Sequence, residues 1–303
     1  MTTLVKEDAP GLTNGIERLA KFFEGRASRP GLLARRALGR EQASDPGLRD
    51  RLVRELRGET RLDGSVGGAV VPTIWRAIEL IELGHDGDQA GTIRVIGWIL
   101  KLQEQAGAYG EDCTDQRHAH KVCEHYVGGF FSPAPPTQRL SPVTLPIGNV
   151  YRSETAARFA TSCLALKAAL MAGYERRPGI QKHLESLVRL QEEFTDWQEY
   201  FAPDMIVAAL GALAMAPPPY RDVLPKATAF VAGHQQEDGT WTNADLFHAL
   251  DALVSAGTPE ARGAVRKAVP FLLKRQRPDG SFGTTAQEER ALVALRALLW
   301  VRS

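Results

Sequence analysis

QEDGTW at residues 236–241 and QRPDGSF at residues 276–282 are two copies of the phrase that decides the fold. Each copy ends one amphipathic run and opens another. Weaker copies occur as LDGSVG at 62–67, QEQAGAYG at 103–110 and QEEFTDW at 191–197. Gln191 and Gln236 are 45 residues apart, and Gln236 and Gln276 are 40 apart, a period typical of helix–turn–helix repeats. The sequence therefore predicts a helical repeat protein with five visible hairpin junctions.

Apolar residues recur at helical spacing along most of the chain, which predicts helices and not strands. A strongly apolar set of helices is expected near residues 74–81, 160–170, 206–213 and 292–299. A more charged set, ending at the junctions, is expected near residues 47–57, 91–104, 179–192, 222–235 and 261–276. Segments 12–24 and 30–40 supply a further pair. The alternation predicts an all-α protein of about five to six helix pairs, arranged as an inner and an outer ring in one domain over residues 1–303.

The junction phrase has a structural explanation. Asp provides an acceptor for turn amides, Gly can adopt a positive φ, and the following aromatic residue packs the joint. The Gln side chain is expected to cap the free carbonyls of the outer helix. We therefore interpret Asp238 and Asp279 as turn residues and not as catalytic acids.

Composition excludes several classes of function. The 303 residues include 37 basic and 36 acidic side chains, a net charge of +1, which does not favour nucleic-acid binding. Three cysteines in a chain of this length do not indicate a disulfide framework, and the N-terminal residues lack the apolar run of a signal peptide. No run of about 20 apolar residues predicts a membrane span. We expect a cytoplasmic protein without a transmembrane segment; the sequence assigns no oligomeric state.

The repeats resemble those of the α/α toroids in the terpene cyclase and protein prenyltransferase superfamily, including the squalene-cyclase-type repeats. The resemblance covers most of residues 47–300 and is clearest at the two phrases quoted above. It implies an α/α toroid with a central apolar cavity that takes an apolar, isoprenoid-type small molecule. It does not imply one activity, because the same fold hosts cyclases, prenyltransferases, lanthionine synthetases and thioester domains.

One insertion interrupts the repeat rhythm, at about residues 105–152, and such interruptions often carry function. It contains a cluster of candidate zinc ligands: Cys113, His118, His120, Cys123 and His125. Thiolate and imidazole groups suit a tetrahedral Zn²⁺, and His120 and Cys123 would share one face of a helix. A site with four protein ligands would be structural, whereas three ligands would leave a position for water or a substrate thiol. The alternative is that the histidines are exposed and the cysteines are small packing residues.

The candidate catalytic residues lie at the starts of the inner helices. Class II cyclases of the resembling superfamily carry a D-x-D-D-T-A phrase whose middle acid protonates an alkene or epoxide. Residues 151–156 read YRSETA, so Glu154 fits, but Tyr151 and Ser153 replace carboxylates. A cyclase would then need other acids. The candidates are Glu154, Asp204, Asp245 and His248.

Each of these candidates has an alternative interpretation. Asp204 and Asp245 fall in the first turns of helices, where a carboxylate also stabilises the helix dipole. His248 and Asp251 are three residues apart and share a helical face; they form an acid–base pair if that face points inward and a solvated pair if it points outward.

These observations lead to two hypotheses. The first is a terpene cyclase or prenyltransferase-like enzyme that takes an isoprenoid-type substrate into the cavity, assisted by zinc. The second is a non-catalytic toroid that binds a ligand or serves as a scaffold, with a metal that only orders the inserted loop.

Overall fold

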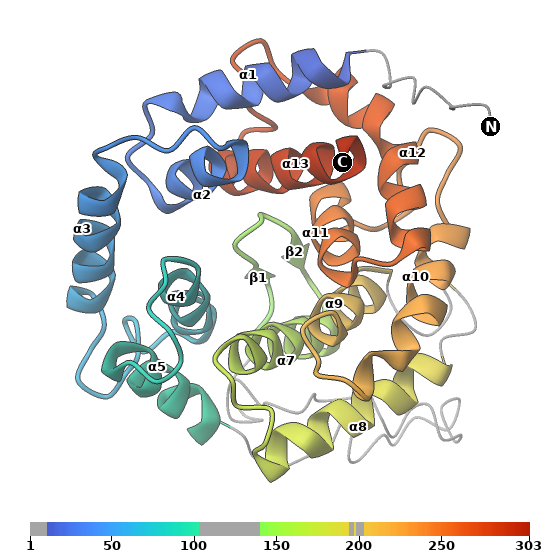
Figure 1. The fold of residues 1–303 in the computed structure, drawn as a ribbon. Helices are drawn as coiled ribbons and strands as arrows, with labels where there is room; N and C mark the ends of the chain where they lie inside the picture. The colour runs from blue at the N-terminus through green and yellow to red at the C-terminus, as the bar shows by residue number, and fades with distance from the viewer. Residues whose placement is uncertain (1–10, 103–139, 194–196, 198–202) are drawn as a thin grey trace.

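The computed structural model describes residues 11–102, 140–193, 197 and 203–303. Twelve α-helices of this part of the chain form six consecutive pairs around a central axis (Figure 1). The outer helices are α1 (Leu12–Glu24), α3 (Asp45–Gly58), α5 (Ala90–Lys101), α8 (Pro178–Glu193), α10 (Leu224–Gly233) and α12 (Pro259–Arg275). The inner helices are α2 (Arg29–Leu38), α4 (Val70–Glu82), α7 (Glu154–Met171), α9 (Pro203–Leu213), α11 (Leu246–Ala256) and α13 (Gln287–Arg302). A short 3-10 helix, η2 (Tyr220–Val223), precedes α10. The predicted all-α toroid of two helical rings is confirmed.

The two rings differ in burial because each inner helix has neighbours on nearly all sides. In α9 every residue except Asp204 is buried, whereas in α3 only Asp45 is buried. Inner helices are rich in small residues, which let backbones approach closely. Examples are Ala208, Ala209 and Ala212 in α9 and Ala291, Ala294 and Ala297 in α13.

The Asp-Gly turns share one geometry at three junctions. Asp63, Asp238 and Asp279 each accept hydrogen bonds from the backbone N–H and the hydroxyl of the residue two positions later, at 2.7–3.0 Å. Each following glycine has a positive φ and lies against the backbone of the next outer helix. A Cβ at Gly239 would come within 2.4 Å of the Lys267 carbonyl oxygen. The turn residues therefore fix both the turn and the spacing to the next repeat.

The junction glutamine differs from the prediction in position and in partner. Gln236 is exposed, and the preceding Gln235 is the buried residue that matches Gln276. The Gln235 side-chain amide donates to the Gly239 and Ala264 carbonyl oxygens, both at 2.9 Å. Ala264 belongs to α12, so the glutamine ties its turn to the outer helix of the next pair and does not cap the helix that it follows.

The ring closes by contact between the last and the first pair. Helix α1 packs on α12 and α13, and α2 packs on α13. Gln276 accepts hydrogen bonds from the Arg18 guanidinium at 2.6 and 2.9 Å and donates to the Gly15 carbonyl oxygen at 3.1 Å. The junction motif therefore joins the two ends of the chain in the same way that it joins successive repeats.

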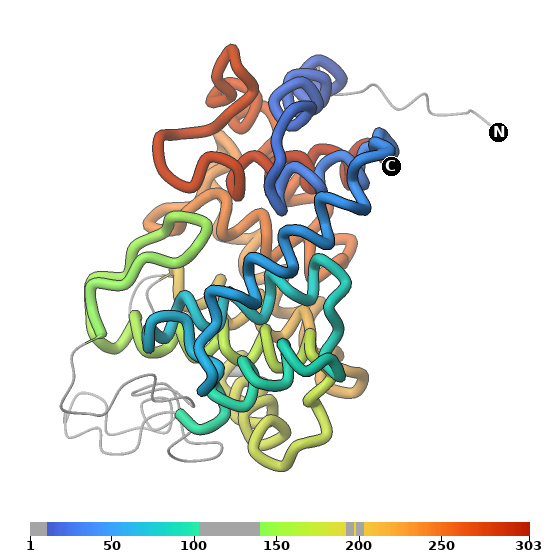
Figure 2. The backbone as a smooth tube through the Cα atoms, turned by 90° about the vertical axis from the view of Figure 1, so that its left-hand side faces the viewer, coloured from blue at the N-terminus to red at the C-terminus, as the bar shows by residue number. Residues whose placement is uncertain are grey.

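The described part of the insertion is a two-stranded antiparallel hairpin, β1 (Val143–Thr144) and β2 (Val150–Tyr151), in which Val143 is paired with Tyr151. It projects into the middle of the ring in Figure 1 and lies at one edge of the ring in the side view of Figure 2. Arg290 of α13 donates to the Ile147 carbonyl oxygen at 2.9 Å and so fixes the tip of the hairpin. The insertion therefore places its tip over the centre of the toroid.

Candidate functional site

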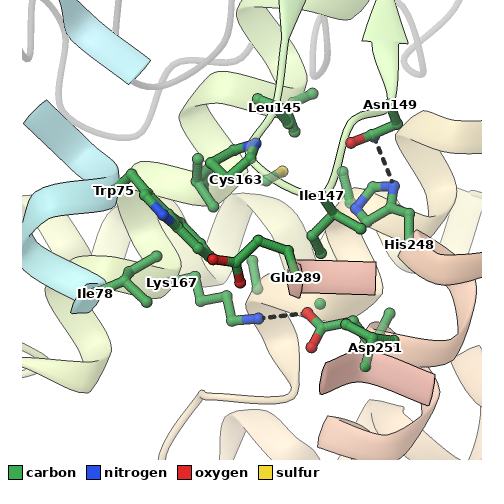
Figure 3. Close-up of a pocket in the computed structure, with 18 of the residues that line it drawn as sticks. Trp75, Ile78, Leu145, Ile147, Asn149, Cys163, Lys167, His248, Asp251 and Glu289 are labelled. Carbon is green, nitrogen blue, oxygen red and sulfur yellow. Dashed lines mark hydrogen bonds and ion pairs between the residues drawn. The ribbon is translucent and has the colours of Figure 1, made fainter. Parts of the chain in front are cut away.

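A cavity lies at the centre of the inner ring (Figure 3). Its empty volume is about 800 Å³, part of which is open solvent at the mouth. All six inner helices and the hairpin tip contribute to its wall. The apolar part of the wall includes Ile78, Leu145, Ile147, Leu164, Leu292 and Val293. A largely apolar wall with a few polar groups is typical of small-molecule sites.

The cavity contains few aromatic side chains. Trp75 is the only Phe, Tyr or Trp among the described lining residues. The Arg29 guanidinium lies 5.0 Å from the centre of the Trp75 ring and occupies part of its face. The ring faces that could stabilise a carbocation are therefore scarce in this wall.

Lys167 and Asp251 form an ion pair on the wall, with 2.8 Å between Nζ and Oδ2. Burial by itself would raise the pKa of Asp251, but the charge and hydrogen bond of Lys167, together with the charge of Arg296, lower the pKa overall. Asp251 is therefore a carboxylate and a poor proton donor.

A second charged group lies where α2, α4 and α13 meet. Arg29 forms ion pairs with Glu82 and Glu289, and Arg296 lies 3.0 Å from Glu82. Burial raises the pKa of Glu289, although Arg29 opposes this effect. Among the described lining residues, three Lys or Arg and three Asp or Glu side chains thus face the cavity, and each of these cations has an acidic partner.

His248 lies on the wall beneath the hairpin, in the first turn of α11. Its Nδ1 is 3.2 Å from the Asn149 side-chain nitrogen, 3.4 Å from the Tyr151 hydroxyl and 3.7 Å from the Asp204 carboxylate. The Tyr151 hydroxyl donates to the Asp204 backbone oxygen at 3.2 Å. Burial, and next the Asp204 charge, raise the pKa of Tyr151 well above its usual value, so its hydroxyl stays protonated.

Asp204 and Asp245 lie behind His248 and do not line the cavity. Asp245 is the N-cap of α11 and accepts from the backbone N–H groups of Phe247 and His248 at 2.9 and 3.1 Å. Asp204 accepts from the Asp245 N–H at 2.9 Å. The structure therefore brings together three of the four predicted catalytic residues, with His248 alone of them at the wall. The face of α11 that carries both His248 and Asp251 points into the cavity.

Glu154 lies apart from this group, at the start of α7. Its carboxylate accepts from the backbone N–H groups of Leu140 and Ser141 at 2.8–3.0 Å and from Arg158 at 2.8 Å. Burial would raise its pKa, but the two backbone N–H donors and Arg158 lower it to about 2. This geometry favours a structural anchor for the base of the hairpin; a catalytic role of Glu154 stays a prediction.

The predicted zinc ligands, from Cys113 to His125, lie outside the described residues. Within the described residues, no group of three or more His, Cys, Asp or Glu side chains could hold a metal ion. The third cysteine, Cys163, is buried in the cavity wall, and burial raises the pKa of its thiol. Cys163 is therefore a thiol and not a thiolate nucleophile.

Sequence reasoning missed several polar groups of the cavity, among them Lys167, Asn149 and the charged cluster of Arg29, Glu82 and Arg296. Lys167 had a usable signal, because it lies four residues after Cys163 and is the one charged residue between positions 159 and 171. Asn149 had none, since it lies in the insertion, where no repeat period indicates which side chains face inward.

Comparison with solved structures shows the same fold in other proteins. A protein from Actinoplanes matches with a TM-score of 0.60 and 16% identity over 96% of this chain and 100% of its own. A variant of the type II terpene cyclase MstE from Scytonema, in complex with its substrate geranylgeranyl dihydroxybenzoate, matches with a TM-score of 0.56 and 13% identity over 96% of this chain and 97% of its own. The apo form of MstE matches with the same TM-score and identity. No family model and no curated protein sequence matches this chain.

The fold is therefore that of a terpene cyclase-like α/α toroid. At sequence identities of 13–16%, these similarities support the shared fold alone. In the described part of the chain, no helix has the length and apolar character required to cross a membrane.

Proposed function

We propose that this protein is a terpene cyclase-like enzyme that acts on an isoprenoid-type molecule in its central cavity. The observation that carries the proposal is the largely apolar cavity, lined by all six inner helices, with His248 among the polar groups of its wall. The structural similarity to MstE, a cyclase bound to a geranylgeranyl compound, supports the same ligand class.

His248 is the proposed acid–base residue, and Asp204 and Asp245 are positioning residues that hold it. A type II cyclisation adds a proton to one alkene carbon, forms a new carbon–carbon bond with another alkene, and returns a proton to a base, so the product is an isomer of the substrate. His248 touches the cavity and is held through Nδ1, so its Nε2–H is the hydrogen that faces the substrate.

One observation favours a ligand-binding toroid without catalysis as the second candidate. The carboxylates at the wall are held by cations, Asp251 by Lys167 and Glu289 by Arg29, and so are weak acids toward an alkene. Tyr151 and Ser153 also replace the carboxylates of the cyclase phrase.

Product analysis distinguishes the cyclase-like enzyme from the ligand-binding toroid without catalysis. Purified protein is incubated with prenylated aromatic acids, squalene and prenyl diphosphates, and the products are identified by mass spectrometry. We expect an isomer of one substrate from the wild type and a rate lower by about 10²–10⁴ in His248→Ala, the usual range for loss of an acid–base group. Gln236→Ala, at an exposed position outside the cavity wall, should retain the wild-type rate. Binding without turnover would establish the second candidate, and absence of both would refute the isoprenoid assignment.

Zinc assistance is a separate part of the proposal and rests on the sequence cluster alone. Elemental analysis of protein purified without a histidine tag should give about one zinc per chain, and a Cys113→Ser, Cys123→Ser double variant should lose it. A metal-free wild type would contradict this part.

A further inference from the structure

Asn149 is a buried side chain of the cavity wall whose amide oxygen lacks a hydrogen-bond partner in the described structure. It is 4% exposed. Both hydrogens of its amide nitrogen are used: one is donated to His248 Nδ1 and the other to the Tyr151 hydroxyl, each at 3.2 Å. In Figure 3 the amide oxygen points away from His248 and over the cavity. A buried acceptor without a donor costs free energy, which a ligand that donates to it would recover.

The same contacts define which nitrogen of His248 carries the proton. Because Nδ1 receives the Asn149 N–H, a neutral ring must hold its hydrogen on Nε2. Tyr151 does not alter this assignment, since its hydroxyl hydrogen goes to the Asp204 backbone oxygen. The second ring nitrogen lies on the side of Ile147 in Figure 3, toward the cavity. Under the hairpin, an acceptor without a partner, Asn149 Oδ1, therefore lies beside a donor, His248 Nε2–H.

We propose that Asn149 and His248 form a subsite for one hydroxyl group on an otherwise apolar, uncharged isoprenoid. A hydroxyl is the smallest group that donates and accepts at one atom, so it can donate to Asn149 Oδ1 and accept from His248 Nε2–H. This proposal rests on the proposed function and defines its substrate class further.

The charges of the wall exclude an ionised ligand group from the same cavity. Lys167, Arg29 and Arg296 are each paired with a carboxylate, so the described lining residues offer no unpaired Lys or Arg for a diphosphate. Placing a diphosphate there would bury uncompensated negative charge beside Asp251 and Glu289. A hydroxyl needs no counter-ion.

The test is equilibrium binding at pH 7.5, followed by tryptophan fluorescence, of four C20 prenyl ligands that share one chain. These are the alcohol, its methyl ether, the hydrocarbon and the diphosphate. The ether accepts a hydrogen bond but cannot donate one, and the hydrocarbon does neither. We expect the wild type to bind the alcohol about tenfold more tightly than the ether, and the hydrocarbon and diphosphate more weakly still.

Two variants separate the subsite from the apolar cavity. Asn149→Ala should bring the alcohol-to-ether ratio close to one. The matched control, Ile147→Ala, removes apolar contact two residues away and should weaken alcohol and ether by the same factor. If Asn149→Ala does not fold, the ligand series on the wild type alone decides.

Each outcome bears on a different claim. Equal binding of alcohol and ether by the wild type, or tightest binding of the diphosphate, overturns the hydroxyl subsite and leaves the isoprenoid cavity intact. Failure to bind any of the four ligands overturns the proposed function together with the subsite.

Discussion

At the residue scale, the glycines of the Asp-Gly junctions lie directly against the backbone of a neighbouring helix. Gly280 has φ +90°, and a Cβ placed on it would lie 2.4 Å from the Arg18 carbonyl oxygen in α1. Gly64 and Gly239 have the same relation to α5 and α12. Glycine is required here for two reasons: L-residues disfavour positive φ, and the neighbour is backbone, which cannot rotate away.

We expect Gly280→Ala to lower the free energy of unfolding by about 2–4 kcal/mol, because strain at positive φ and the contact with the α1 backbone add. Urea denaturation followed by circular dichroism measures the change. Gly263→Ala is the matched control. Gly263 lies within α12 with open space around the position of a Cβ, so alanine should stabilise the protein by about 0.5–1 kcal/mol. Equal stability of Gly280→Ala and wild type would refute the close approach.

At the scale of elements, the junction glutamines connect a turn to a helix of the next pair. The Gln235 side chain reaches Ala264 in α12, and that of Gln276 reaches Gly15 and Arg18 in α1. Helix pairs in a repeat protein contact only their neighbours, so such links transmit the geometry of one pair to the next.

Replacing Gln235 should destabilise the protein, whereas replacing the adjacent Gln236 should not. Gln235→Ala loses two buried hydrogen bonds, and we expect a decrease of about 2 kcal/mol in the free energy of unfolding. Gln236→Ala changes an exposed side chain and should stay within about 0.5 kcal/mol of wild type. Thermal and urea unfolding of the two variants side by side provide the measurement. A larger effect at Gln236 would contradict the assigned register.

At the scale of the whole molecule, folding changes the pKa values of many carboxyl groups. The pKa is lowered at Asp45, Asp63, Glu154, Asp238, Asp251 and Asp279. It is raised, first by burial, at Glu79 and Glu289. A carboxyl with a lowered folded pKa stabilises the fold above its unfolded pKa, and this contribution is lost as the pH falls through the folded value. A carboxyl with a raised pKa acts in the opposite direction.

The six lowered groups outnumber the two raised ones, so stability should decrease as the pH falls from about 5 toward 2. The lower end of this window is the pKa of Glu154, about 2. The urea midpoint should therefore be lower at pH 3 than at pH 6. Glu154→Gln provides the control, because it should reduce the midpoint at pH 6 and approach the wild type near pH 2. A midpoint that rises on acidification would contradict the pKa directions given above.

The helical rings were predictable from the sequence because their determinants are local. Apolar periodicity identified the helices, and the Asp-Gly turns depend on residues two positions apart, so both could be read without knowledge of distant contacts. The position of the structural glutamine was not predictable, since Gln235 and Gln236 are adjacent and only the packing of α12 selects one of them.

The sequence by itself thus determined the all-α class, the helix pairs, their Asp-Gly turns and a set of polar candidates near the starts of the inner helices. Only the tertiary structure decided which polar side chains meet, because the partners lie far apart along the chain: Asn149 lies 99 positions from His248, and Lys167 lies 84 from Asp251. No local pattern encodes such distances in a closed ring. The tertiary structure placed Glu154 at the base of the hairpin, Asp204 and Asp245 behind His248, and the unpaired oxygen of Asn149 over the cavity, where it defines the chemistry of the proposed ligand.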